Sequence, residues 1–261
     1  MAEKHIIAIA NQKGGVGKTT TAINLGAALA EVGHQVILVD LDPQGNASTG
    51  LGIDVDRRSI SVYDLLTSDS DLEAAAQPTA FPRLKVVPAT SDLSSADVQL
   101  SQVADRTRLL ARQLASAPEG VIVLIDCPPA LGLLTVNAMV AANAVLVPLQ
   151  AEFYALEGLS QLLATVKEVR ASANPGLRIN GVVLTMSDYR NNLSQQVEAD
   201  ARATLGDLVY PTVIPRNVRV SESPSHAQPV LTYDPLSKGS IAYRQFAAEF
   251  AARLKLVPEI A

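Results

Sequence analysis

A glycine-rich segment with two lysines and three threonines follows the first apolar stretch of the chain. It reads Asn11-Gln-Lys-Gly-Gly-Val-Gly-Lys-Thr-Thr20, with Thr21 next. Glycines let backbone N–H groups curve around a polyphosphate, and the N-terminus of a following helix adds its positive dipole. Lys18 can then reach the β- and γ-phosphates, and the Thr19 hydroxyl can ligate Mg²⁺. The spacing predicts a phosphate-binding loop made by Gly14, Gly15, Val16, Gly17, Lys18, Thr19 and Thr20.

The loop departs from the usual pattern at its entrance. Gln12 stands where a phosphate-binding loop ordinarily has glycine, and Lys13 follows it. A second lysine is not needed within one subunit, because Lys18 already neutralises phosphate. Lys13 either reaches a partner subunit's nucleotide, as an arginine finger does, or is an exposed lysine with no role. The residues alone leave both interpretations open.

Three aspartates follow apolar segments that are typical of strands. Asp40 ends one such segment and Asp42 lies two residues later, while Asp126 ends the most apolar segment of the chain. Carboxylates at these places suit two tasks, the holding of Mg²⁺ and the positioning of an attacking water. We therefore predict a metal site at Thr19, Asp40 and Asp126. Asp42 begins an Asp-Pro-Gln-Gly sequence, so an ordinary turn is an alternative role for it.

Short β-branched segments alternate with helical patterns along the chain. This alternation predicts a doubly wound α/β fold, with a mostly parallel sheet covered by helices on both faces. The expected strands cover residues 6–10, 36–39, 84–87, 121–125, 144–147 and 181–185, and a further candidate ends at 213–217. The expected helices cover 19–32, 156–171 and 194–205. Residues 54–82 are the least regular, and nothing divides the chain, so residues 1–261 are expected to form a single domain.

Composition narrows the classes of protein that fit. Hydrophobic residues make up 48% of the 261 residues and aromatic residues only 4%, which predicts a large aliphatic core. No apolar run is long enough to span a bilayer, and the chain is expected to be cytoplasmic. The net charge of −5 argues against a uniformly basic nucleic-acid-binding protein but leaves room for a local basic patch. The single cysteine, Cys127, is expected to be a buried core residue.

These motifs together resemble one family. The Lys13-Gly-Gly-Val-Gly-Lys-Thr19 segment resembles the deviant Walker A motif of the ParA/MinD superfamily, whose signature lysine contacts nucleotide across a sandwich dimer. The resemblance implies that ATP and Mg²⁺ are bound, and that Lys13 acts in an ATP-bound homodimer. The segment around Asp42 resembles the switch I box needed for hydrolysis, and Ile125-Asp126-Cys-Pro-Pro129 resembles Walker B and switch II. The resemblance covers residues 6–254.

The late part of the chain resembles the short chromosomal ParA (Soj-like) type. By this resemblance Met186, Pro215 and Asn217 contact adenine. It also implies non-specific double-stranded DNA binding by Arg190, Arg216 and Arg219, association with the nucleoid, and hydrolysis stimulated by a ParB-like centromere-binding protein. Taken singly, each arginine is equally compatible with a solvated surface position. The Met186-Ser-Asp-Tyr-Arg190 sequence differs in its middle from common versions, which weakens the assignment of Arg190 most.

Three related functions are alternatives. A MinD-like membrane ATPase would end in a basic amphipathic helix, but the apolar positions of residues 241–254 are expected to dock on the protein body, so no membrane binding is expected. An electron-transfer reductase of the nitrogenase iron-protein type needs two cluster cysteines per subunit, and the chain has one. A division-site-positioning relative shares the motifs and differs mainly in its partner.

Overall fold

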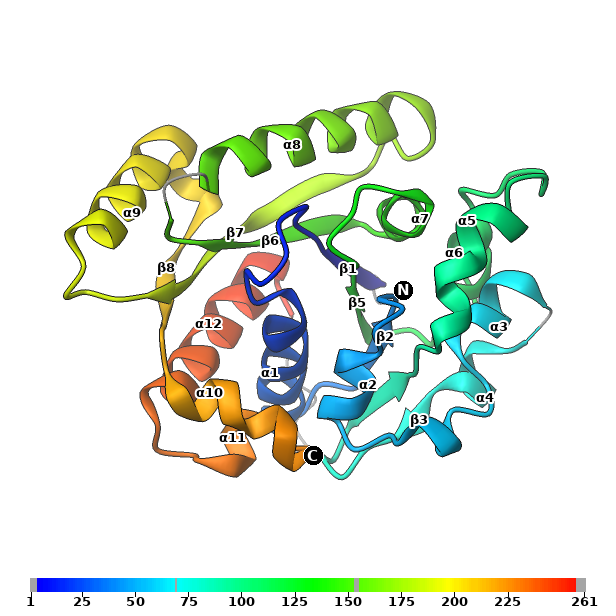
Figure 1. Cartoon of the computed structure of the whole chain (residues 1–261), viewed down its shortest axis with the longest axis horizontal. Coiled ribbons are helices and arrows are strands. Elements are labelled where there is room, and N and C mark those ends of the chain that lie inside the picture. Colours follow the sequence, from blue (N-terminus) through cyan, green and yellow to red (C-terminus); the bar gives the residue numbers. More distant parts are fainter. Residues whose placement is uncertain (1–3, 69, 153–154, 257–261) are drawn as a thin grey trace.

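The protein is built around a continuous, mostly parallel β-sheet (Figure 1). The computed structural model describes residues 4–68, 70–152 and 155–256. Within them the sheet has eight strands in the order β3-β4-β2-β5-β1-β6-β7-β8. The strands are β1 (His5–Ile9), β2 (Val36–Asp40), β3 (Gln77–Pro78), β4 (Leu84–Val87), β5 (Ile122–Asp126), β6 (Ala144–Gln150), β7 (Arg178–Ser187) and β8 (Val209–Pro215). Only the short β3–β4 pair is antiparallel in the described sheet.

The central strands are buried on both faces. Every residue of β2, β5 and β6 is buried, which agrees with their nearly continuous apolar sequences. Strand β5 lies between β2 and β1, and its last residue, Asp126, pairs in register with Asp40 on one side and Ile9 on the other. The carboxyl ends of these three strands therefore lie side by side, at the end of β1 from which the phosphate-binding loop leaves.

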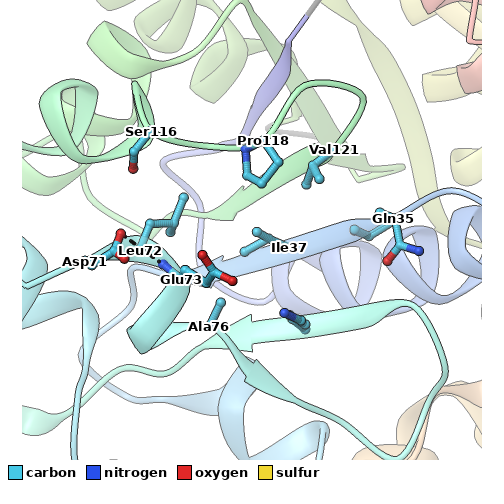
Figure 2. A pocket seen from close by; sticks show the side chains of 11 residues that line it. Gln35, Ile37, Asp71, Leu72, Glu73, Ala76, Ser116, Pro118 and Val121 are labelled. Carbon is cyan, nitrogen blue, oxygen red and sulfur yellow. Dashed lines mark hydrogen bonds between the residues drawn. The ribbon is translucent and has the colours of Figure 1, made fainter.

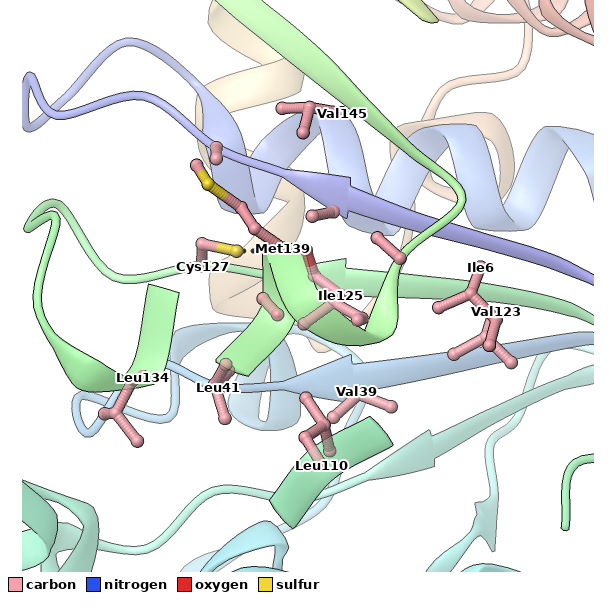
Figure 3. Close-up of a cluster of buried hydrophobic side chains, with 14 of the residues drawn as sticks. Ile6, Val39, Leu41, Leu110, Val123, Ile125, Cys127, Leu134, Met139 and Val145 are labelled. Atoms are coloured by element: carbon pink, nitrogen blue, oxygen red, sulfur yellow. Dashed lines mark hydrogen bonds between the residues drawn. The ribbon is translucent and has the colours of Figure 1, made fainter. Parts of the chain in front are cut away.

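Helices cover both faces of the sheet, each over its own apolar cluster. One cluster involves α3 (Val62–Thr67), α4 (Leu72–Ala75), α5 (Ala96–Gln99), α6 (Leu109–Leu114), α7 (Leu133–Ala141), α8 (Ala155–Ser172) and α9 (Asn192–Leu205). Figure 3 shows part of it, with Cys127 among aliphatic side chains. The other involves α1 (Lys18–Glu31), α2 (Asn46–Gly50), α10 (Val218–Glu222), α11 (Val230–Tyr233) and α12 (Lys238–Leu254). The predicted doubly wound α/β fold is confirmed.

The helix that follows the phosphate-binding loop is covered by the last helix of the described chain. Figure 1 shows α1 and α12 on the same face of the sheet, where they pack together. The Thr21 and Tyr243 hydroxyls lie 3.4 Å apart, and the Val230 backbone N–H donates to Asn24 Oδ1 at 2.8 Å. The apolar positions of α12, including Phe246 and Phe250, are buried, so this helix docks on the body as expected. Among the described residues, no helix combines the length and apolar character needed to cross a bilayer.

The structure refines the predicted element boundaries. Strand β7 runs from Arg178 to Ser187, longer at both ends than the predicted 181–185, because its polar end residues hide it from an apolar pattern. The irregular region 54–82 contains α3, α4, β3 and a 3₁₀ turn, η1 (Val55–Arg57). Three further 3₁₀ turns lie elsewhere: η2 (Ser91–Ser95), η3 (Gly206–Leu208) and η4 (Ser223–His226).

Candidate nucleotide-binding site

The loop between β1 and α1 has the backbone shape that its glycines allow. Gly15 and Gly17 have φ angles of 74° and 83°, in the left-handed region that side chains disfavour. A Cβ added at Gly17 would meet nothing closer than 3.7 Å, so the backbone angle rather than crowding requires glycine there. Helix α1 begins directly after it, at Lys18, and points its N-terminus at the loop. This is the arrangement that binds polyphosphates.

Lys18 is folded back onto its own loop. Its side chain is buried, and Nζ donates to the Lys13 carbonyl oxygen at 3.0 Å. Burial lowers the pKa of the Lys18 ammonium, and Asp126 partly opposes this effect. A buried ammonium that is held mainly by a neutral carbonyl is well placed to turn toward an anionic ligand in the loop.

Asp40 and Asp126 form a buried pair of carboxylates beside Lys18. Burial, followed by the nearby Asp40, raises the pKa of Asp126 well above its usual range. Thr19 lowers this pKa, yet neither Asp126 carboxylate oxygen makes a hydrogen bond in the described structure. A buried carboxylate without a partner, next to a second carboxylate and a threonine hydroxyl, fits a divalent cation. The structure thus brings together the three residues predicted to hold Mg²⁺.

Asp40 differs from Asp126 because it has partners of its own. Its Oδ2 accepts from the Ser48 hydroxyl at 2.6 Å and from the Ser48 backbone N–H at 2.8 Å. Burial raises the pKa of Asp40 to about 6, and the Ser48 hydrogen bonds limit the rise. Asp40 therefore also anchors α2, the short helix that follows the loop at residues 42–45.

Asp42 forms the turn that its sequence suggested. Its Oδ1 accepts from the Gln44 backbone N–H at 3.0 Å, and its carbonyl accepts from the Gly45 N–H at 2.9 Å. The side chain is also buried and close enough to Lys18 and Asp126 to influence their pKa values. The turn and the hydrolytic interpretation are thus compatible, since the turn presents the carboxylate to the phosphate site.

Lys13 forms an ion pair within its own chain. Its Nζ lies 2.8 Å from Glu152 Oε2, just after β6, and both side chains are more than a third exposed. An ion pair with this exposure contributes at most about 1 kcal/mol. Glu152 also accepts from the Gln150 side chain, which holds it at the edge of the loop. The contact can therefore be exchanged for another at little cost.

The three residues predicted to contact a base lie together beside the loop. Met186, Pro215 and Asn217 line one pocket with Gly17 and Thr20. Thr185 fixes this side of the site, because its hydroxyl donates to the Val16 carbonyl at 2.8 Å. Asn217 caps α10, since its Oδ1 accepts from the Arg219 backbone N–H at 2.9 Å. Met186 has a φ of 53°, an uncommon angle for a residue with a side chain.

The three arginines predicted to bind DNA lie on the surface around the same strand ends. Arg190 pairs with Asp188 at 3.1 Å, and its side chain is 91% exposed. Arg219 pairs with Glu222 at 3.0 Å and with Asp234 at 3.3 Å. Arg190 and Arg216 line one surface pocket with Lys238. Two of the three guanidinium groups are thus engaged with acids of their own chain.

Known proteins resemble the chain over most of its length. A family model described as an AAA domain matches residues 4–179. The chain is 57% identical to the chromosome partitioning protein ParA of Caulobacter vibrioides, over 95% of this chain and 94% of that protein. It is 51% identical to the sporulation initiation inhibitor protein Soj of Bacillus subtilis, over 95% of this chain and 98% of that protein. The chain belongs to the ParA/MinD-type family of ATPases.

Solved structures share the fold of this ParA/MinD-type ATPase. One is cobyrinic acid a,c-diamide synthase from Mycobacterium smegmatis with bound ADP and magnesium, at 39% identity and a TM-score of 0.84. The match covers 99% of this chain and 100% of the synthase chain. Another is the cell division ATPase MinD of Pyrococcus furiosus, at 28% identity and a TM-score of 0.80, over 96% and 99% of the two chains.

Four residues of the site escape prediction from the sequence of this ParA/MinD-type chain. Ser48 bonds Asp40, Glu152 pairs with Lys13, and Thr185 bonds the loop carbonyl of Val16. The fourth, Arg58, bonds the Ala89 carbonyl and the Thr49 hydroxyl. Glu152, Thr185 and Arg58 bond residues that lie 139, 169 and 31 positions away, and Ser48 bonds Asp40 across the turn at residues 42–45, so no local pattern signals them. Thr185 alone carries a usable signal, its position near the end of an apolar strand.

A second enclosed pocket lies at the opposite edge of the sheet in this ParA/MinD-type ATPase (Figure 2). It is lined by apolar side chains, among them Ile37, Leu72, Pro118 and Val121, and by polar ones such as Asp71 and Glu73. It lies near the N-terminal ends of β2 and β5, whereas the loop lies at their carboxyl ends.

Proposed function

We propose that this ParA/MinD-type ATPase uses the energy of ATP hydrolysis to partition DNA, with residues 1–261 acting as one unit in the cytoplasm at the nucleoid. The observation that carries the proposal is the 57% identity to a chromosome partitioning protein over nearly the whole of both chains. Similarity to the diamide synthase is lower, at 39%, and favours the partition assignment over amide synthesis.

The phosphate site supports Mg²⁺-dependent ATP hydrolysis. Lys18 exchanges the Lys13 carbonyl for the β- and γ-phosphates, and the loop N–H groups of residues 14–20 surround them. Thr19, Asp40 and Asp126 would hold the metal, and the burial of the two carboxylates makes a cation strongly favourable there. Bound Mg²⁺ supplies charge neutralisation at the phosphate oxygens. Asp42 orients the attacking water from the turn after β2.

The dimer is formed through the nucleotide. Lys13 leaves Glu152 and reaches the phosphates bound by a second copy of the chain, which couples dimerisation to ATP. Met186, Pro215 and Asn217 hold the base at the other end of the site. The dimer then presents Arg190, Arg216 and Arg219 of both subunits to the phosphate backbone of double-stranded DNA, without sequence preference.

Hydrolysis ends the DNA-bound state. Loss of the γ-phosphate removes the group that Lys13 and Lys18 contact, so the dimer dissociates and DNA is released. A ParB-like centromere-binding protein accelerates this step, and repeated cycles move its DNA cargo. The motif set is shared with division-site-positioning relatives, and the two functions differ in the partner that stimulates hydrolysis.

The decisive experiment measures binding to random-sequence duplex DNA and to anionic liposomes, with ATP, with ADP and without nucleotide. We expect DNA binding only with ATP, falling steeply as salt is raised because each phosphate contact displaces a counterion. The Asp42→Ala variant is expected to bind DNA with ATP and to retain it, since hydrolysis no longer releases it. Binding of ATP-loaded protein to liposomes but not to DNA would make the protein a MinD-like membrane ATPase.

A further inference from the structure

Arg58 is a buried arginine, and each of the three nitrogens of its guanidinium group donates at least one hydrogen bond. Only 9% of the residue is exposed. Nε and Nη2 donate to the Ile53 carbonyl at 3.1 and 2.9 Å, and Nη2 also donates to the Thr49 hydroxyl at 2.8 Å. Nη1 donates to the Ala89 carbonyl at 3.0 Å, and a longer contact joins Nη2 to the Gly45 carbonyl at 3.4 Å.

The acceptors of Arg58 are backbone carbonyls and a hydroxyl, with no carboxylate among them in the described structure. A buried charge without a counter-ion is costly, and here hydrogen bonds that join separate segments of the chain offset that cost. The planar fork suits this role, because it fixes several acceptors in one plane. Arg58 joins the segment 45–53 to Ala89, which follows β4.

Both backbone polar groups of Ala89, the N–H and the carbonyl, form hydrogen bonds with side chains of this region. Its N–H donates to the Ser48 hydroxyl at 3.0 Å, and its carbonyl accepts from Arg58. Ser48 in turn donates to Asp40. Asp40 and Arg58 are therefore the two ends of one network that fixes α2 against the end of β4.

The same network reaches Asp42 through Gly45. The Gly45 N–H donates to the Asp42 carbonyl, closing the turn that presents the Asp42 side chain. Gly45 has a φ of 62°, and a Cβ there would lie only 2.3 Å from Arg58 Nη1. The guanidinium therefore occupies the space beneath the turn that a side chain at position 45 would fill.

We propose that Arg58 is a positioning residue for ATP hydrolysis, which holds the turn of residues 42–45 in the shape that aims Asp42 at the phosphate site. The inference rests on the hydrolytic role of Asp42 in the proposed function. Arg58 contacts neither Lys18 nor the loop at residues 11–17 through any described hydrogen bond. Its loss should therefore affect the rate of the chemical step and spare nucleotide binding.

The test compares Arg58→Lys and Arg58→Ala with Arg57→Ala in the full-length protein with ATP and Mg²⁺. Arg57 is the adjacent residue, but it is exposed, so its truncation is a matched control. For both Arg58 variants we expect the single-turnover rate to fall about 100-fold, the effect of a catalytic group misplaced by about 1 Å. Lysine keeps the charge but not the fork, so it should not restore the rate. The ATP dissociation constant should stay within about twofold of the unmodified protein, since the phosphate contacts remain.

Two further measurements separate positioning from general stability. Millimolar guanidinium should raise the rate of Arg58→Ala severalfold and leave that of Arg57→Ala unchanged, because only the former has a cavity of matching shape. Thr49→Val removes one acceptor of the fork, and its effect on the rate should be smaller in the Arg58→Lys background than in the unmodified protein.

Unchanged turnover in folded Arg58→Lys and Arg58→Ala would overturn the inference. The inference would also be overturned if the ATP affinity and the melting temperature of the Arg58 variants fell in proportion to their turnover rate. Arg58 would then contribute only to the stability of the fold. If Arg58→Ala does not fold, Arg58→Lys and the Thr49→Val pair decide. Retained turnover in Asp42→Ala would remove the hydrolytic role from the proposed function itself. Lost turnover there, with full turnover in the Arg58 variants, would remove only the role of Arg58.

Discussion

The phosphate site and the arginine surface lie at neighbouring strand ends but are built in opposite ways. In the phosphate site, Lys18, Asp40 and Asp126 are buried, and Asp126 has no hydrogen-bond partner in the described structure. On the surface, Arg190 is 91% exposed and Arg219 is 53% exposed, and each already pairs with acids of its own chain. The phosphate site thus has an unpaired charge available to a ligand, whereas the surface arginines must give up their present ion pairs to bind one.

The difference determines how strongly each region should respond to mutation. Charges act strongly on one another where water is excluded, and weakly where it is not. Changes to the buried charges should therefore alter activity by orders of magnitude, and changes to the exposed pairs by small factors. Three experiments test this comparison.

The largest effect is expected from Lys18→Ala. The change removes the one ammonium buried inside the described part of the loop, so ATP turnover should fall by about 1000-fold or more. Steady-state phosphate release and ATP binding by calorimetry measure it. Lys85→Ala, an exposed lysine on β4, is the control and should keep full turnover. Substantial turnover in Lys18→Ala would mean that burial does not make this site sensitive, and the comparison would fail.

A smaller effect is expected from Asp40→Asn on the pH dependence of stability without Mg²⁺. The pKa of Asp40 is raised to about 6, so the folded state binds a proton that the unfolded state releases near pH 4. The stability linked to that proton is present below pH 4 and is lost as the pH rises through about 6, and Asp126 acts in the same direction. Asp40→Asn should abolish the part due to Asp40, about 3 kcal/mol for a shift of about two units.

Urea unfolding at intervals from pH 4 to pH 7.5 measures this dependence. Asp56→Asn, an exposed carboxylate of the same size, serves as the control and should follow the unmodified protein. A profile for Asp40→Asn that parallels the unmodified protein across the whole interval would show that burial of Asp40 does not strain the metal-free site.

The smallest effect is expected from Glu222→Gln on the arginine surface. The change frees Arg219 from its nearest acid and leaves Asp234, so DNA affinity with ATP should rise only about two- to fivefold. Titration of a labelled duplex at low and moderate salt measures it. Glu119→Gln makes the same change of charge on a distant exposed loop and should alter affinity less. Equal gains in both variants would attribute the effect to net charge alone.

The sequence predicts the phosphate site well because its residues are contiguous or end apolar strands. Glycines and Lys18 stand in one run, and Asp40 and Asp126 each follow an apolar segment, so the meeting of parallel strand ends brings them together. The resemblance implies that Met186 and Asn217 contact adenine, and the two residues line one pocket with Gly17.

The remaining features depend on packing that no local pattern encodes. Arg57 and Arg58 are adjacent and chemically identical in the sequence, yet one is exposed and the other is buried under the Asp42 turn. Arg58 differs from Arg57 because its guanidinium group donates to the carbonyl of Ala89, a residue more than thirty positions away. Strand β3 was missed for a related reason, since two residues, Gln77 and Pro78, are too short for any periodicity.

The contact between α1 and α12 also has a consequence for synthesis on the ribosome. Thr21 and Tyr243 are separated by 222 positions, and Asn24 and Val230 by 206. At about 5–20 residues per second, the ribosome needs on the order of 10 to 40 seconds to make the helix that covers α1. Helix α1, which follows the phosphate-binding loop, is thus synthesised well before the helix that packs over it.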